Sequence, residues 1–256
     1  MPAPVILLHG WPGSPEDFRA VLPLLDGLEV IVPDLLGFGA AFDDEVPEGE
    51  ASAGRHAERI RALIAERGLE RPVLAGYDVG SRVAQAFGRR FGDELTGLVV
   101  TPGHPGVQEH VGSAQAQEEQ WYQHLHRLPL LRELLDGDRG AIAAYLGHFW
   151  THWAAEGAGL AHGEAFERVV DAYARPGALW ASTAWYRDNT SYDAPGPVTA
   201  PTTLLWPAAD PLYPRAWGDH LEEWFTELRV EDVPGGHFVP LEAAQPFAAA
   251  VRAAAG

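Results

Sequence analysis

The chain has 256 residues, of which 46% are hydrophobic and 21% are charged. This composition indicates one large folded domain, or one domain with a sizeable insertion, and excludes a disordered or coiled-coil chain. The 18 basic residues, all arginines, stand against 36 acidic residues and give a formal net charge of −18, which argues against nucleic acid or an anionic membrane as a partner. The absence of cysteine excludes disulfides, thiolate metal sites and a cysteine nucleophile.

The N-terminal segment Met1-Pro2-Ala3-Pro4 leads directly into an apolar run, with no basic segment and no long apolar stretch before it. No signal peptide is therefore predicted. The chain also lacks a run of about 20 apolar residues, the length that spans a bilayer. We expect a cytoplasmic protein.

The first hundred residues alternate between strand and helix patterns. Short apolar runs typical of buried parallel strands occur at Val5–Leu8, Val30–Val32, Val73–Ala75 and Leu98–Val100. Helical patterns lie between them at Ser14–Leu25, Ala53–Arg67 and Ser81–Phe91. This alternation predicts a parallel sheet with helices on both faces.

The alternation stops after Val100 and returns only after the prolines near residue 200. The intervening segment, about 105–195, has successive helical patterns rich in Trp, Tyr and His. Strand patterns then follow at Thr203–Trp206 and Leu228–Val233, and a final helix is expected at about Leu241–Ala255. We therefore predict a core formed by 1–102 and 201–256, and a helical cap at 103–200 that covers the carboxyl ends of the strands.

A candidate nucleophile follows the third strand, in the run Gly76-Tyr77-Asp78-Val79-Gly80. A nucleophile flanked by small residues at a strand-to-helix turn is typical of the nucleophile elbow, whose strained backbone needs glycine on either side. The alternative is that Asp78 caps a helix or belongs to a structural turn.

A candidate oxyanion hole follows the first strand, in the run His9-Gly10-Trp11-Pro12-Gly13. Its backbone N–H groups would face the elbow, so that Trp11 and Val79 would together supply two donors to a developing negative charge. The alternative is a tight turn rich in glycine and proline.

Two further candidates follow the last two strands. Asp210 comes after the fifth strand, and His237 follows two glycines after the sixth. The order nucleophile, acid, histidine matches that of the α/β hydrolases. Four such elements in the right order at strand ends indicate a catalytic site.

An aspartate nucleophile narrows the chemistry. A carboxylate is ionised at pH 7 and attacks saturated carbon to give an ester, whereas its attack on a carboxylic ester would give a reactive anhydride. Asp78 therefore indicates an epoxide or an alkyl halide as substrate. His237, oriented by Asp210, would deprotonate the water that hydrolyses the ester.

The leaving group separates these two classes. An epoxide oxygen needs an acid such as a tyrosine hydroxyl, whereas a halide needs N–H donors such as indole. The segments Trp121-Tyr122-Gln123 and Trp185-Tyr186-Arg187 each offer one hydroxyl and one indole, although such aromatic residues more often belong to a core. The histidine pairs His124/His126 and His148/His152 lack nearby carboxylate partners in the sequence, and no metal is predicted.

These motifs resemble those of the epoxide hydrolases of the α/β-hydrolase fold, over essentially the whole chain. The similar stretches are His9-Gly10-Trp11-Pro12, Asp34-Leu-Leu-Gly-Phe-Gly39, Tyr77-Asp78-Val79-Gly80, Thr101-Pro-Gly-His-Pro105, Tyr122-Gln123 with Arg127 and Pro129, Trp185-Tyr186-Arg187, Asp210 and His237. The resemblance implies that Tyr122 and Tyr186 bind and protonate the epoxide oxygen while Asp78 attacks. It implies no cofactor. The residues expected to line the substrate site are Trp121, Gln123, Trp150 and Trp185.

The chain departs from this family in two ways. Val79 stands where the family commonly has Trp, which in dehalogenases donates to the halide. The two leading strands usual in this fold are missing, which leaves about six strands and an exposed sheet edge that a second copy of the chain is one candidate to cover. The alternatives to an epoxide hydrolase are a haloalkane or haloacid dehalogenase with the same Asp78, Asp210 and His237, and a binding protein on a silent hydrolase fold.

Overall fold

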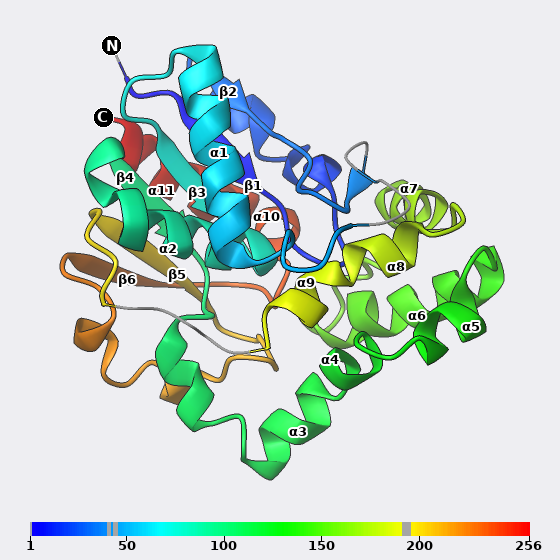
Figure 1. Ribbon diagram of the computed structural model, residues 1–256. Helices are drawn as coiled ribbons and strands as arrows, with labels where there is room; N and C mark the ends of the chain where they lie inside the picture. The colour runs from blue at the N-terminus through cyan, green and yellow to red at the C-terminus, as the bar shows by residue number, and fades with distance from the viewer. Residues whose placement is uncertain (1, 40–41, 43–45, 191–195) are drawn as a thin grey trace.

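The computed structural model describes residues 2–39, 42, 46–190 and 196–256. Its strands form one six-stranded sheet in the order β2-β1-β3-β4-β5-β6, and every neighbouring pair is parallel. The strands are β1(Val5–Leu8), β2(Val30–Ile31), β3(Val73–Gly76), β4(Gly97–Val100), β5(Thr202–Pro207) and β6(Leu228–Val233). The predicted α/β-hydrolase fold with six strands is confirmed (Figure 1).

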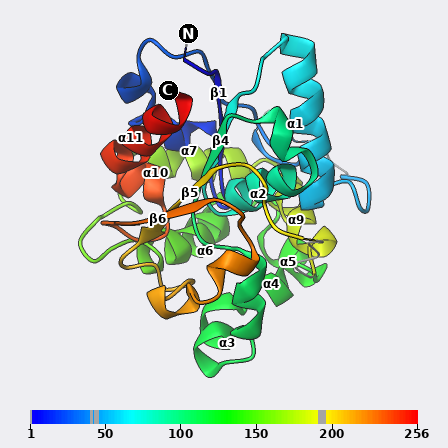
Figure 2. The ribbon, with the colours of Figure 1, turned by 90° about the vertical axis from the view of Figure 1, so that its left-hand side faces the viewer.

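The central strands form the core of the molecule. Every residue of β1, β3 and β4 is buried, as expected for strands covered on both faces. Helices α1(Ala53–Arg67) and α2(Val79–Phe91) cover one face, and α11(Ala244–Ala255) covers the other (Figure 2). The central strands are thereby enclosed, and polar side chains can meet beyond the ends of these strands.

Two predicted helices are interrupted in the structure. Instead of one helix at Ser14–Leu25 there are two short 3₁₀ helices, η1(Pro15–Phe18) and η2(Leu22–Leu25). A proline inside a helix lacks the N–H for the helical hydrogen bond and clashes with the preceding turn, and Pro23 would lie in the interior of the predicted helix.

The C-terminal helix is interrupted for the same reason. The structure has α10(Val239–Glu242) and α11 in place of one helix at Leu241–Ala255. The ring of Pro246 would clash with the carbonyl of Glu242, four residues earlier, if the helix were continuous.

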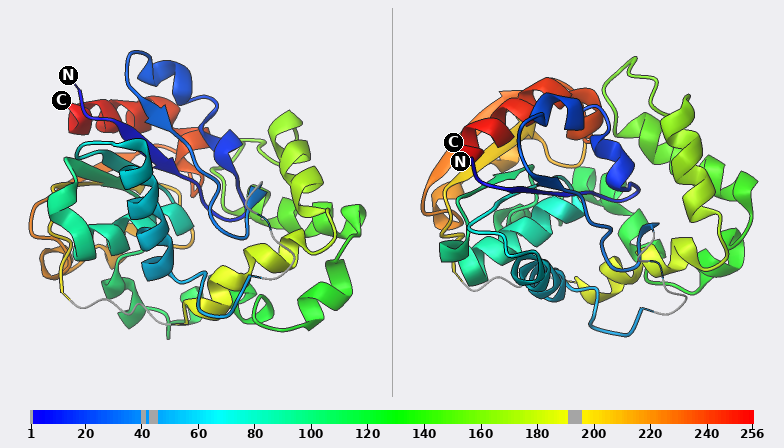
Figure 3. Two further views of the ribbon diagram at one scale, coloured as in Figure 1. Left: turned by 45° about the horizontal axis from the view of Figure 1, so that its top comes forward. Right: turned by 90° about the horizontal axis from the view of Figure 1, so that it is seen from above.

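A group of helices lies between β4 and β5, and we call α3–α9 the cap helices. They are α3(Ala114–Gln120), α4(Tyr122–Leu125), α5(Leu130–Leu135), α6(Arg139–His152), α7(Glu164–Tyr173), α8(Ala178–Ser182) and α9(Ala184–Asp188). Figure 3 shows most of them together beside the core. The indole of Trp150 donates to the Pro12 carbonyl at 3.0 Å, so the cap helices contact the loop that follows β1.

The remaining described elements are short 3₁₀ helices. They are η4(Gly92–Glu94), η5(Pro105–Glu109), η6(Arg215–Trp217) and η7(Leu221–Glu223). Within the described ranges, no helix is both long and apolar enough to cross a membrane.

Candidate active site

Asp78 occupies a strained turn between β3 and α2. Its backbone has φ 50° and ψ −119°, in the left-handed region that residues with a Cβ rarely adopt. The glycines around it allow a close approach of backbone segments, because a Cβ on Gly80 would lie 2.1 Å from the Leu8 carbonyl oxygen. This local geometry presents the Asp78 carboxylate beyond the end of the sheet.

The loop after β1 holds one oxygen of this carboxylate. The backbone N–H of Trp11 donates to Asp78 Oδ1 at 2.7 Å, and the indole of Trp11 donates to Ser182 of α8 at 3.2 Å. Val79 is the first residue of α2, and N–H groups in a first helical turn have no partner within the helix. A negatively charged oxygen at Oδ1 therefore faces at least one directed donor.

His237 connects Asp78 to Asp210. Its Nδ1 lies 2.9 Å from Asp210 Oδ2 and its Nε2 lies 3.2 Å from Asp78 Oδ2. The second oxygen of Asp210 accepts the backbone N–H of Leu212 at 2.9 Å, and the backbone N–H of His237 donates to the Trp153 carbonyl at 2.8 Å. The imidazole is thereby held between two carboxylates with its orientation set from both sides.

The two carboxylates determine the charge of the imidazole. Burial lowers the pKa of His237, but the charges and hydrogen bonds of Asp210 and Asp78 outweigh it and raise that pKa to about 10. His237 is therefore protonated at neutral pH before Asp78 has reacted. An ester at Asp78 would remove one of the two anions and lower the pKa of His237, so that the imidazole becomes a base only after Asp78 has reacted.

Two tyrosines of the cap helices lie near Asp78. Tyr122 of α4 and Tyr186 of α9 are buried, and their ring centroids lie 5.6 Å apart. Tyr122 also stacks on Trp11 at 5.8 Å. Burial, Tyr122 and Asp78, together with a hydrogen bond to Tyr122, raise the pKa of Tyr186 well above its usual value, so the Tyr186 hydroxyl keeps its proton at neutral pH. The structure thus brings both predicted tyrosines together near Asp78.

Four other predicted site residues lie away from this cluster. Trp121 is 41% exposed and lines, with Gln123, a separate pocket between the cap helices and α2. The Trp150 indole is bound to the Pro12 carbonyl and its ring packs on Phe166 and Phe238. The Trp185 ring packs on His56 of α1 and under the Arg82 guanidinium.

Three residues that no sequence motif marked as site residues, His126, Tyr145 and Trp153, also pack near the candidate catalytic side chains. The His126 ring lies 4.4 Å from Trp11 and 4.5 Å from Tyr186, and its Nε2 lies 2.8 Å from the Tyr145 hydroxyl. Trp153 packs edge-on against His237 at 5.2 Å. In the sequence His126 appeared only as half of a histidine pair with His124. In the described part of the chain, no group of three or more His, Asp or Glu residues is arranged to hold a metal ion.

A buried acid lies under the loop after β1. Asp17 Oδ2 accepts the Tyr77 hydroxyl at 2.5 Å and the backbone N–H of Ser14 at 2.9 Å. Burial is the largest influence and raises the pKa of Asp17 to about 7, against the opposing effect of these hydrogen bonds. Tyr77 directly precedes Asp78, so the hydrogen bond between Tyr77 and Asp17 helps to fix the turn that carries Asp78.

Comparison with known proteins agrees with this architecture. The family described as alpha/beta hydrolase fold matches residues 3–244. The chain belongs to this family. As in other α/β hydrolases, its candidate nucleophile, acid and histidine come in that order along the chain, after β3, β5 and β6.

The curated relatives of this α/β hydrolase have several different activities in their names. A 2-succinyl-6-hydroxy-2,4-cyclohexadiene-1-carboxylate synthase from Pectobacterium atrosepticum is 31% identical over 143 residues, 55% of each chain. A soluble epoxide hydrolase from Corynebacterium sp. is 34% identical over 105 residues, 41% of this chain and 36% of the relative. A haloalkane dehalogenase from Mycobacterium marinum is 32% identical over 102 residues, 39% and 34% of the two chains. The chain thus spans about half or less of the length of these relatives.

Solved structures share the fold over nearly the whole chain. Cfl2 from Burkholderia cenocepacia superposes with a TM-score of 0.84 at 25% identity, covering 100% of this chain and 88% of Cfl2. The epoxide hydrolase CorEH superposes with a TM-score of 0.83 at 22% identity, covering 97% of this chain and 89% of CorEH. At this identity the second likeness concerns the fold alone.

Proposed function

We propose that this α/β hydrolase converts an epoxide to a vicinal diol through a covalent ester on Asp78. The observation that carries the proposal is the environment of the Asp78 carboxylate. One oxygen accepts the Trp11 N–H at 2.7 Å and the other lies 3.2 Å from His237, while two buried tyrosines lie close by. A nucleophile, a base and an acid are thus adjacent.

In the first half-reaction Asp78 Oδ2 attacks one epoxide carbon. The carbon–oxygen bond breaks, its electron pair stays on the oxygen, and a proton from Tyr186 or Tyr122 neutralises the alkoxide. Oδ2 is the nucleophilic oxygen because Oδ1 is occupied by the Trp11 N–H. The hydrogen bond between the two tyrosines allows either one to replace the proton of the other.

After the first half-reaction the imidazolium proton of His237 passes to the tyrosinate, which restores the tyrosine hydroxyl. The neutral His237 Nε2 then takes a proton from water, and the hydroxide attacks the carbonyl carbon of the Asp78 ester. The negative charge develops on Oδ1 and is stabilised by the N–H groups of Trp11 and Val79. Collapse of this intermediate releases the diol and restores the carboxylate. Asp210 stabilises the imidazolium that forms.

The donors in the site favour an epoxide over a halide. A halide would need N–H donors, but the indoles of Trp11 and Trp150 already donate to Ser182 and to the Pro12 carbonyl. The position after Asp78 holds Val79. Haloalkane dehalogenase remains the second candidate, because it would use the same Asp78, Asp210 and His237 and is the named activity of one relative.

The test is a panel of aryl and alkyl epoxides and haloalkanes, assayed for diol formation and for halide release. We expect diol from the wild type and none from Asp78→Ala, whose fold is checked by circular dichroism. Diol formation that survives in Asp78→Ala would overturn the mechanism. Halide release without diol would replace the proposal with dehalogenation, and tight binding without either product would indicate a binding protein.

A further inference from the structure

A cavity lies outside the aromatic cluster, between the cap helices and the core. It has a volume of about 570 Å³, within the range of small-molecule sites. Its wall carries two arginines and four glutamines, namely Arg82, Arg127, Gln108, Gln117, Gln120 and Gln123. Among the described residues along this wall none is acidic, although the chain as a whole has a net charge of −18.

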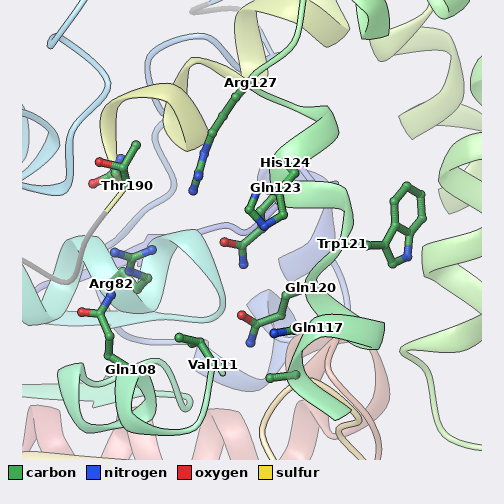
Figure 4. A pocket seen from close by; sticks show the side chains of 12 residues that line it. Arg82, Gln108, Val111, Gln117, Gln120, Trp121, Gln123, His124, Arg127 and Thr190 are labelled. Atoms are coloured by element: carbon green, nitrogen blue, oxygen red, sulfur yellow. The ribbon is translucent and has the colours of Figure 1, made fainter. Parts of the chain in front are cut away.

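The two arginines reach the cavity from different elements. Figure 4 shows Arg82 on core helix α2 and Arg127, which follows α4, with their side chains directed into the same space. The Arg82 guanidinium lies over the Trp185 ring at 5.2 Å, and the Arg127 Nε donates to the Tyr186 carbonyl at 3.0 Å. Both cations are thereby held in place, which lowers the entropy cost of binding a ligand between them.

The remaining donors of Arg127 are directed at the cavity. A guanidinium has five N–H groups, and in the described part of the chain Arg127 makes no ion pair and uses one of them, in the bond to Tyr186. Glutamine amides add further donors, and Val111, Ala116 and part of Trp121 add apolar surface. A planar anion with two oxygens and an apolar tail matches this combination.

We propose that this cavity binds the carboxylate of a small organic acid. The cavity adjoins the catalytic groups, because its lining residues Trp121 and Gln123 flank Tyr122 and its lining residue Arg127 donates through Nε to the Tyr186 carbonyl at 3.0 Å. The carboxylate therefore comes either from the far end of the substrate or from a separate acid. The first source rests on the proposed function, whereas the binding site itself does not.

Calorimetric titration with three probes that share one tail tests the binding site. We expect the wild type to bind sodium hexanoate at least about tenfold more tightly than 1-hexanol, and to bind hexylammonium chloride least, because one charged hydrogen bond is worth at least this factor. Gln123→Glu and Arg82→Gln should each weaken hexanoate binding about tenfold. Arg139→Gln is the matched control, since Arg139 pairs with Glu167 and Asp171 on the cap surface. Equal binding of hexanoate and hexanol, or equal binding by Gln123→Glu and Arg139→Gln, would overturn the proposal.

Kinetics with an epoxy acid and its methyl ester then identify the source of the carboxylate. If it belongs to the substrate, Gln123→Glu should lower kcat/KM about tenfold for the acid and leave the ester unchanged. If it belongs to a separate acid, both substrates should respond alike while hexanoate still binds. Hexanoate binding in a wild type that forms no diol would keep the anion site and refute the proposed function.

Discussion

The two walls of the candidate active site are built in different ways. The wall from the sheet has three ionisable side chains after β3, β5 and β6, namely Asp78, Asp210 and His237, joined at 2.9 and 3.2 Å. The wall from the cap helices has aromatic rings, with Tyr122 and Tyr186 packed at 5.6 Å. A parallel sheet positions charged groups through its strand ends, whereas the short cap helices position their side chains through packed rings and hydrogen bonds between side chains.

The largest effect is expected in the sheet wall, at His237. Glutamine keeps a polar side chain there but cannot take a proton from water, so His237→Gln should lower steady-state turnover of an epoxide by about 10⁴-fold. Alkylation of Asp78 needs no base and should continue. Intact-protein mass spectrometry should therefore detect the mass of the His237→Gln variant plus that of the epoxide, and Asp78→Ala is the control without adduct. Turnover close to that of the wild type would contradict this role.

The next effect concerns the buried acid below the same wall. Burial raises the pKa of Asp17 from its ordinary value of 3.8 to about 7, so the folded state binds a proton that the unfolded chain releases between these pH values. Its contribution to the free energy of unfolding should fall as the pH rises from about 4 to 7, by roughly 3 to 4 kcal/mol. Urea denaturation of the wild type and Asp17→Asn across this range measures the difference. A difference that does not change with pH would contradict the buried neutral acid.

A smaller effect is expected in the cap wall, at the two tyrosines. Phenylalanine keeps the ring packing and removes the proton, so Tyr122→Phe and Tyr186→Phe should each slow alkylation of Asp78 by about 10²-fold, the usual contribution of one acid. Single-turnover formation of the alkyl-enzyme in the His237→Gln background measures this step. If alkylation slows only in the double variant, the two tyrosines replace one another as the acid. An unchanged rate in the double variant would contradict an acid role for both.

The sequence predicted the sheet wall better than the cap wall for a physical reason. The turn around Asp78 and the residues after each strand are set by local backbone geometry, which glycines and apolar runs indicate directly. The cap helices α4, α8 and α9 have four or five residues each, so local periodicity does not determine which side they present. Tyr122 was predicted near the site, whereas its neighbour Trp121 lies on the other side of α4 and Trp153 came without a signal.

The two interrupted helices also could not be predicted from apolar spacing alone. Apolar spacing predicted a helix at Ser14–Leu25, but Pro23 prevents its continuation. The same applies to Pro246 in the C-terminal helix. In both segments the proline ring prevents a continuous helix in spite of the apolar spacing. That spacing indicates which face of the segment is buried, but not whether the backbone hydrogen bonds of a helix continue through it.

The smallest effect on activity is expected at Trp185, directly beside Tyr186. The Trp185 ring packs on His56 of α1 at 5.8 Å and is 2% exposed, so Trp185→Phe removes buried contacts away from Asp78. We expect the free energy of unfolding to fall by about 1 to 3 kcal/mol while kcat/KM for a neutral epoxide changes less than about threefold. Tyr186→Phe is the matched control with the opposite pattern, lower activity at nearly unchanged stability. Loss of activity in Trp185→Phe without loss of stability would instead place the indole in the substrate site. Trp185 would then contact the substrate in addition to its packing on His56 of α1.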